Sequence, residues 1–336
     1  MMFSNFGDQA RTFILSRQSS ELKSQLERAS TELATGQVQD TAQAVGGNFS
    51  ALAEIEEAVS SIEAFTTANS EAAFFVENAQ SSLEFVQKMT TDAAPALLLA
   101  SNTNNNSLIN TTTLDTKQKL VAVVSAINTQ STGRSLFSGQ ATDRPPLASV
   151  DDMIADLAPL VATETTAAGA MGVIDAWFDD AGGGFETMGY TGSNATLAPF
   201  GVGPGRTAAF DITAKDDGIK DALKGLMTAA LVSQGTLAAQ PDARNLLLQM
   251  AGETLLSNEN ELSALRAAAG TAEAHIEEMR IQNETERHAL DHAYNRIMSA
   301  DPYSAATELE AVQTQLETLY TITARLSRLN LVDFLR

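Results

Sequence analysis

The strongest constraint on the fold is a long series of apolar residues with helical spacing near the C-terminus. From Leu262 to Ile297 the series advances alternately by three and four residues, and nine of its eleven positions are apolar. This spacing aligns one stripe of side chains along an α-helix, as in a coiled coil. Asp301-Pro302 ends the series, because proline cannot continue a helix and restricts the residue before it. A helix of this length favours a rod over a compact globule.

Two further helices are predicted to belong to this rod. One begins near Phe49, follows the same spacing through Leu52 and Ile62, and extends to about Leu99. At 1.5 Å per residue, its roughly fifty residues would span about 75 Å. A polar break, "SNTNNNS", separates it from a third helix that is expected to end near Thr132.

Both ends of the chain carry apolar stripes of the same kind, which we call the terminal seams. The first helix is expected to end at Gly36, which can close it, and the last helix begins after Pro302. We predict that copies assemble through these seams. Their residues are Leu15, Leu22, Leu26 and Leu33 at the N-terminus and Leu309, Val312, Leu316, Leu319, Leu326 and Leu329 at the C-terminus.

The placement of charge supports assembly through the ends. The formal net charge is -21, yet residues 1–35 are neutral and residues 301–336 carry only -2, so the remaining -19 lies between them. Like charges repel when many copies pack together, which favours contacts through the near-neutral ends. The acidic middle of the chain is expected to face water.

The middle of the chain has a different composition. Residues 140–245 hold 13 of the 21 glycines and no long seam. Short apolar runs alternate there with glycine turns, which predicts a small antiparallel sheet flanked by helices at 151–161 and 217–232. The predicted fold is mainly α, a long antiparallel helical rod or coiled coil with an inserted small α+β domain. Its predicted parts are terminal coiled-coil helices at 1–40 and 301–336, rod helices at 41–139 and 246–300, and an inserted outer domain at 140–245.

The stretch "SLFSGQATDRPPL" is predicted to be the border between the rod and the inserted domain. Glycine frees the backbone to turn, and a double proline fixes the direction of exit by locking φ. The border residues are Phe137, Gly139, Pro145 and Pro146. We expect Phe137 to pack where the chain returns, near Leu247 and Met250. We also expect deletion of about 150–235 to permit export and at least partial assembly.

Several functional classes are excluded by composition. The chain lacks the Lys/Arg stripe that binding to nucleic acid requires. It has no cysteine for a disulfide or a thiolate metal site. The longest apolar run, 93–100, contains a proline and is far shorter than the roughly 20 residues of a membrane-spanning helix. The N-terminus lacks the basic start and apolar block of a cleaved signal peptide, so the chain is expected to be cytoplasmic or exported without one.

Motifs that could carry chemistry are weak. His288 and His292 have the spacing of a two-histidine metal pair, but we interpret them as part of a solvated face. The sequences "GVGPG" and "AKDDGIKD" match neither a phosphate loop nor an EF-hand. Trp177-Phe178 is interpreted as a core anchor. With no nucleophile–base pair to argue for, we predict no enzyme activity, no cofactor and no metal.

Three stretches resemble the bacterial flagellin superfamily. "LERASTELATGQ" is similar to the end of that family's N-terminal helix. "RSLFSGQATDRPPL" resembles the border motif of the hook-associated protein 3 family, whose members join hook to filament. The C-terminal stretch from "MSADPYSAATELE" to "RLNLVDFL" is similar to the same family's ending. The resemblance covers about 35–140 and 250–336.

The resemblance implies a structural role outside the cell. Members are exported through the flagellar type III apparatus, with a chaperone and without a cleaved signal peptide. A ring of copies then assembles at the end of the hook, between the preceding hook-associated junction protein and flagellin. The terminal helices would pair as an inner coiled coil facing neighbouring subunits, with the rod helices in the next layer and the glycine-rich domain outside. No membrane or nucleic acid is implied as a partner.

Two alternatives remain open from the sequence. The chain could be flagellin itself, the filament subunit, although the border stretch and the C-terminal ending favour the junction protein. From a different class, it could be a cytoplasmic coiled-coil adaptor. Copy number per flagellum distinguishes flagellin, which is present in many copies, from a junction protein, which is present in about one ring. Presence in the culture medium distinguishes an exported protein from a cytoplasmic adaptor.

Overall fold

The structure of the chain is a computed structural model that describes the backbone of residues 4–334 and the side chains of residues 10–325. The chain divides into two compact units. Residues 1–62 and 285–336 form one, the terminal unit, and residues 63–284 form the other, the central unit. The mainly helical fold predicted from the sequence is confirmed.

The long helices follow the predicted series closely. Two of them, α3 and α9, contribute residues to both units. The second and third predicted helices are α3 and α4, although α4 ends at Ile127, before the expected Thr132. The long helices are α1 (Ser4–Thr35), α3 (Ser50–Ser101), α4 (Asn106–Ile127), α9 (Glu259–Met298) and α10 (Pro302–Phe334), and a single turn, α2 (Thr41–Ala44), follows α1. Among the described residues, no helix is long and apolar enough to span a bilayer.

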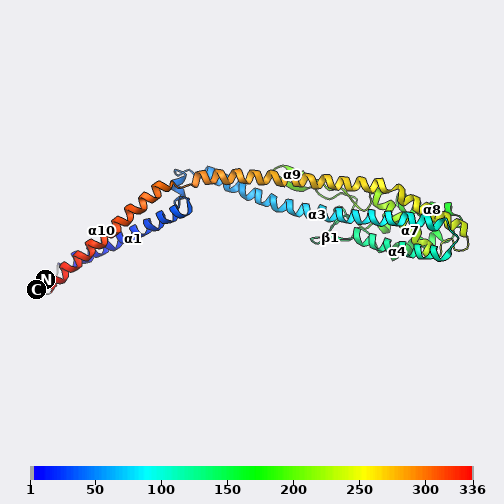
Figure 1. The fold of residues 1–336 in the computed structure, drawn as a ribbon, viewed down its shortest axis with the longest axis horizontal. Helices are drawn as coiled ribbons and strands as arrows, with labels where there is room; N and C mark the ends of the chain where they lie inside the picture. The colour runs from blue at the N-terminus through cyan, green and yellow to red at the C-terminus, as the bar shows by residue number, and fades with distance from the viewer. Residues whose placement is uncertain (1–3, 335–336) are drawn as a thin grey trace. The chain divides into compact units, whose positions relative to one another are not determined.

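In the terminal unit, α1 and α10 run antiparallel and side by side (Figure 1). Helix α1 ends, and helix α10 begins, at the same level of this pair. Gly36 takes a φ of +70° after α1, and the Asp301 side chain accepts a hydrogen bond from the backbone N–H of Tyr303 at the start of α10. The two breaks are joined by backbone hydrogen bonds, from Val38 N–H to the Met298 carbonyl at 2.8 Å and from Ala300 N–H to the Gly36 carbonyl at 2.9 Å. These two hydrogen bonds hold the end of α1 beside the start of α10, and so set how the two helices align with each other.

The central unit contains shorter elements between α4 and α9. Helix α6 is not in the sequence prediction, and α8 lies largely within the rod helices predicted at 246–300, which the structure interrupts at Asn258. The small sheet expected within 140–245 is the two-stranded hairpin β3–β4, and a second hairpin, β1–β2, lies before that range. The β3–β4 ladder has a bulge between Gly201 and Gly203. The elements are β1 (Gln130–Ser131), β2 (Arg134–Ser135), α5 (Val150–Val161), α6 (Ala167–Asp179), a π-helical turn η1 (Phe185–Gly189), β3 (Phe200–Gly203), β4 (Arg206–Ala208), α7 (Asp217–Ser233) and α8 (Pro241–Ser257).

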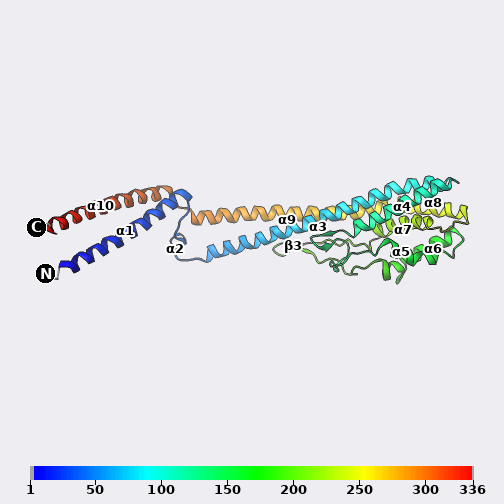
Figure 2. The same cartoon turned by 90° about the horizontal axis from the view of Figure 1, so that it is seen from below.

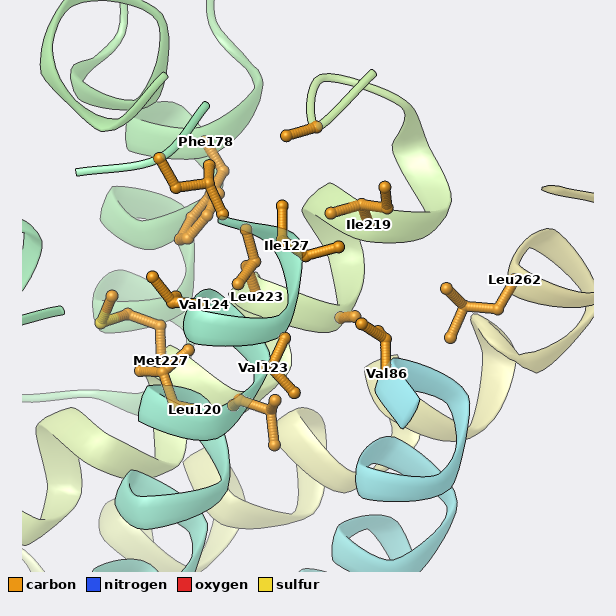
Figure 3. Packing of buried hydrophobic residues seen from close by; sticks show 14 of the residues in the cluster. Val86, Leu120, Val123, Val124, Ile127, Phe178, Ile219, Leu223, Met227 and Leu262 are labelled. Carbon is orange, nitrogen blue, oxygen red and sulfur yellow. The ribbon is translucent and has the colours of Figure 1, made fainter. Parts of the chain in front are cut away.

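Helix α7 lies at the centre of this unit and is buried almost all round. Helices α4, α5, α6 and α8 pack against it. Small residues allow close approach: a Cβ at Gly225 would collide with the side chain of Leu255, and one at Gly218 with that of Leu265. Figure 3 shows Leu223 and Met227 of α7 beside Leu120 and Val124 of α4, within the same cluster as residues from α3 and α9.

The position of α7 revises one expectation. Residues 140–245 were predicted to form an inserted domain with its own core, yet α7 completes the core shared by α3, α4, α8 and α9. The three predicted parts therefore do not coincide with the two compact units. We no longer expect residues 150–235 to be removable.

A buried lysine links α6 to α7. The Lys224 ammonium group, with a side chain only 9% exposed, forms ion pairs with Asp175 at 3.4 Å, with Asp221 at 3.2 Å and with Asp179. Desolvation by burial would lower the pKa of Lys224, but the hydrogen bond to Asp179 and the charge of Asp221 outweigh it, so its pKa lies above the ordinary value. The ammonium group therefore stays charged and holds three carboxylates together.

Replacing Lys224 by alanine is expected to destabilise the central unit by about 1–3 kcal/mol, because Asp175 and Asp221 lose this ion pair while Asp179 keeps its pair with Lys220 at 3.3 Å. Denaturant unfolding followed by circular dichroism measures the change. Lys88→Ala, at an exposed site on α3, is the matched control and should change the free energy of unfolding by less than about 0.5 kcal/mol. Equal stability of K224A and the parent would contradict the structural role of the cluster.

Candidate assembly interface and domain border

The predicted terminal seams meet along the contact between α1 and α10. Leu22 packs in one buried cluster with Val312, Leu316 and Leu319, and Leu15 and Leu26 are partly buried at its edge. These residues come together because their spacing places them on the facing sides of two antiparallel helices.

The remaining predicted seam residues lie elsewhere. Leu309 is half-buried, whereas Leu33 is 40% exposed and outside the cluster. Leu326 and Leu329 lie in a part of α10 whose side chains are outside the described residues. Ala305, which sequence reasoning did not include, is buried four residues before Leu309 and continues the same spacing.

The terminal helices also leave large apolar side chains uncovered. Phe13 and Ile14 are 71% and 61% exposed on α1, and Tyr320 and Ile322 are about half exposed on α10. The buried cluster between the helices is small, so much of their apolar surface faces water in a single chain. Exposed apolar surface of this kind is typical of a protein–protein interface.

Charges contribute little to this surface. Arg17 and Glu21 form an i,i+4 pair at 3.0 Å, and both side chains are more than half exposed. An exposed pair of this type contributes only about 0.3–0.5 kcal/mol. Burial of apolar side chains by another chain is therefore the main source of binding energy that the terminal helices offer.

The border stretch is fixed by hydrogen bonds to residues 189–195. Gly139 takes a φ of +59°, and a Cβ there would collide with the Ala195 carbonyl oxygen, so this position requires glycine. The Gln140 N–H donates to that same carbonyl at 3.0 Å, and the Ser193 N–H donates to the Ser138 carbonyl at 2.9 Å. Glycine is therefore needed at position 139 for two reasons: the backbone has a positive φ, and the Ala195 carbonyl lies too close to leave room for a side chain.

The two prolines present carbonyl groups to the same segment. The Thr191 hydroxyl donates to the Pro145 carbonyl at 2.5 Å, and the Thr191 N–H donates to the Pro146 carbonyl at 2.8 Å. The Asn128 side chain, at the end of α4, both accepts from the Leu147 N–H at 2.9 Å and donates to the Leu147 carbonyl at 3.0 Å. The border is thus tied to α4 on one side and to the loop after η1 on the other.

Phe137 is fully buried, and its aromatic neighbour is Phe210, which the sequence analysis did not name. Its ring lies 6.4 Å from that of Phe210, which in turn meets Phe75 of α3 at 5.6 Å. The Arg134 guanidinium lies over the rings of Phe75 and Phe200 at 5.6 and 5.8 Å, a cation–π contact.

The expected partners of Phe137, Leu247 and Met250, lie on α8, which packs against α6 and α7. Phe210, between β4 and α7, has no helical spacing that marks it, so the sequence pattern does not predict it as a neighbour of Phe137.

Replacing Phe137 by alanine is expected to destabilise the central unit by about 3–5 kcal/mol, since it empties a fully buried site. Limited proteolysis should then cut faster near 140 and 210, while α9 stays intact. Phe85→Ala, at a site that is 36% exposed, is the control and should cost much less. Cutting at the parental rate would show that the border does not depend on this ring.

Tyr190 gives the border a dependence on alkaline pH. Burial, together with the charge of Asp216, raises the pKa of Tyr190 to about 12 from its ordinary 10. Its hydroxyl donates to the Ser193 carbonyl at 2.9 Å. The neutral phenol is therefore the form that the fold favours.

We expect the free energy of unfolding to fall by about 2–3 kcal/mol between pH 10 and 12, because the unfolded chain loses the phenolic proton first. Below pH 10 both states hold the proton, and this contribution is fully present. Tyr190→Phe cannot ionise and should lose less stability over the same interval. Denaturant titrations at each pH would contradict this assignment if the two curves fell in parallel.

The other candidates from the sequence have structural positions. Trp177 and Phe178 are buried against each other, and the Trp177 indole N–H donates to Asp156 at 2.7 Å. His288 and His292 are exposed on α9. Within the described residues, no group of three or more His, Cys, Asp or Glu side chains is arranged to hold a metal.

Comparisons with known proteins place the chain beside flagellar proteins. Residues 253–335 match the model of the bacterial flagellin C-terminal helical region. The structure is similar to FlgL of Bacillus cereus, with a TM-score of 0.51 and 15% identity over 72% of this chain and 100% of that one. A putative flagellar hook-associated protein from Vibrio parahaemolyticus follows, with a TM-score of 0.46, 14% identity and coverage of 73% and 95%. A comparison with curated protein sequences gives no match.

Proposed function

Because residues 253–335 carry a flagellin C-terminal helical region, we propose that this chain is a structural component of the bacterial flagellum, of the hook-associated type that joins hook to filament. This region includes all of α9 and α10, so it contains one side of the terminal seam. The fold shared with FlgL supports the same assignment.

The observation that carries the proposal is the apolar surface of the paired terminal helices. Phe13 and Ile14 on α1 and Tyr320 and Ile322 on α10 are exposed in the single chain, while the ends are nearly neutral. A chain of net charge -21 can bring many copies together more easily through such ends than through its acidic middle. We infer that neighbouring copies in a ring cover these side chains.

The partners follow from that position. We propose contacts with further copies of the chain, with the preceding hook-associated junction protein on the hook side and with flagellin on the filament side. The chain would reach this place through the flagellar export apparatus, helped by a chaperone, without a cleaved signal peptide, and would act outside the cell. Its role is mechanical, with no catalytic step.

Immunogold labelling of sheared flagella tests the proposal. A junction protein places one cluster of label at the hook end of each filament, whereas a filament subunit places label along its whole length. Flagellin is the second candidate, since the matched region is named for it. A cytoplasmic adaptor would give no label on flagella and no protein in the culture medium. Label along the whole filament, or no label on flagella, would overturn the assignment.

Deletion of the gene gives an independent test. Cells that lack a junction protein should build hooks but release flagellin into the medium as unassembled subunits, because filament growth has no base. Plasmid-borne wild-type protein should restore filaments. Normal filaments in the deletion strain would contradict the proposal.

A further inference from the structure

Two histidines on α9 have no role in the assembly proposed above. His288 and His292 lie four residues apart in the stretch "HALDH", within the terminal unit. Both side chains are exposed. Within the part of the chain that the structure describes, neither imidazole forms a hydrogen bond or an ion pair. Their ring nitrogens are therefore available to a ligand from solution.

The helix places the two side chains on one face. Helix α9 is α-helical from Glu259 to Met298, and Figure 2 shows it as one continuous helix. Residues four apart on an α-helix are neighbours, with about 5–6 Å between their Cβ atoms. Because α9 continues past His292, the backbone at both positions is held by helical hydrogen bonds. The spacing of the two imidazoles is thus fixed before any ligand binds.

Two imidazoles at this spacing can chelate a transition-metal ion. Helices that contain the H-E-x-x-H motif bind Zn²⁺ through histidines with the same separation. Imidazole nitrogen suits Zn²⁺, Ni²⁺ and Cu²⁺, whereas Mg²⁺ and Ca²⁺ prefer oxygen ligands. In "HALDH" an alanine occupies the position of the glutamate that serves as general base in that motif. The pair therefore offers binding without the hydrolytic chemistry.

The charges beside the pair nearly balance. Asp291 follows His288 by three residues and attracts a cation, whereas Arg296 follows His292 by four residues and repels one. Among the described residues, no group of three or more His, Cys, Asp or Glu side chains is arranged to hold a metal. The two imidazoles must therefore supply the binding, and water can fill the remaining coordination positions.

We propose that His288 and His292 bind one divalent late first-row transition-metal ion, of the class of Ni²⁺, Cu²⁺ and Zn²⁺. The bound ion links two successive turns of α9, because both imidazoles reach it only while the backbone between them is helical. From the sequence alone we interpret the pair as part of a solvated face, and its exposure in the structure is what gives an ion access. This inference does not rest on the proposed flagellar role.

Isothermal titration calorimetry with Ni²⁺ tests the proposal on the full-length protein, produced without a polyhistidine tag. We expect one ion to bind per chain. In His288→Gln and in His292→Gln the affinity for Ni²⁺ should fall at least about tenfold, because the second ligand no longer acts within the same molecule. His275→Gln removes the third histidine of the chain, which has no other histidine one turn away on α9, and should bind as the parent does.

A spacing variant separates chelation from simple attraction to imidazole. His292→Ala combined with Ala289→His keeps three histidines and changes only exposed positions. It places the pair at adjacent residues, which do not face each other on a helix, so its affinity should match that of H292Q. Circular dichroism should show the parental helix content in every variant. Parental affinity for Ni²⁺ in the spacing variant, or in both H288Q and H292Q, would overturn the proposal.

Discussion

Replacing both Leu316 and Leu319 by aspartate is expected to abolish assembly while the central unit stays folded. Both side chains are buried in the cluster that joins α10 to Leu22 of α1. A carboxylate placed there without a partner costs several kcal/mol per site. That is more than a small cluster can absorb, and the pairing of α1 with α10 should be lost together with the surface that it presents to other copies.

The assembly defect is measured in a deletion strain that expresses the variant. We expect secreted protein in the medium, no filaments and no motility. Circular dichroism of the purified variant should still show a cooperative transition of the central unit. Filaments formed by the double aspartate variant would contradict the proposal that the terminal unit is responsible for assembly.

Two controls separate burial from charge. Leu316→Met with Leu319→Met keeps the volume and apolar character of the seam and should assemble normally. Thr318→Asp adds a charge at an exposed position between the same two residues. If T318D also abolished assembly, the defect would arise from charge on a surface between copies and not from loss of the seam inside one chain.

The sequence predicted the parts of the fold that depend on one helix at a time. The spacing from Leu262 to Ile297 needs only the geometry of the helix itself to be read, and α9 covers it fully. Gly36 and Asp301-Pro302 act on the backbone locally, so the ends of α1 and the start of α10 follow from them. The seam residues of the candidate interface were found in the same way.

The features that the sequence did not reveal, which are the break between α8 and α9 and the helix α6, depend on tertiary contacts. Helix α8 is separated from α9 at Asn258, whose side chain donates to the Gly218 carbonyl at 2.7 Å. No periodicity records such a contact. Helix α6, "AAGAMGVIDAWFD", is short and contains two glycines, so its intrinsic helix propensity is low. Its packing against α7 and α8 stabilises it as a helix.

The largest revision concerns α7. A surface helix shows one apolar stripe, whereas a helix buried all round shows apolar and small residues on every side. In α7 the sequence "ALKGLMTAALV" has that second pattern. From the sequence we predict a short flanking helix of a separate domain there, because the glycine-rich strands before it dominate the composition. Burial on all sides instead identifies α7 as the centre of the unit.

Deletion of residues 150–235 is therefore expected to unfold the central unit. The deletion removes α7 and uncovers the sides of α4 and α8 that face it. Loss of one fully buried large side chain costs about 2–5 kcal/mol, and a whole domain is stable by only about 5–15 kcal/mol. The large side chains of α7 that leave the core are Ile219, Leu223, Leu226, Met227, Leu231 and Val232.

A second deletion provides the comparison. Removing only 150–213 and joining the ends with a glycine–serine linker keeps α7 between α4 and α8, so this variant should retain a cooperative, though lower, thermal transition. The variant that lacks 150–235 should show no cooperative transition of the central unit, and it should aggregate through the uncovered faces of α4 and α8. Thermal circular dichroism and size-exclusion chromatography distinguish the two. A soluble 150–235 variant that melts as sharply as the parent would mean that the segment is an appendage after all, and that the core of α3, α4, α8 and α9 closes without α7.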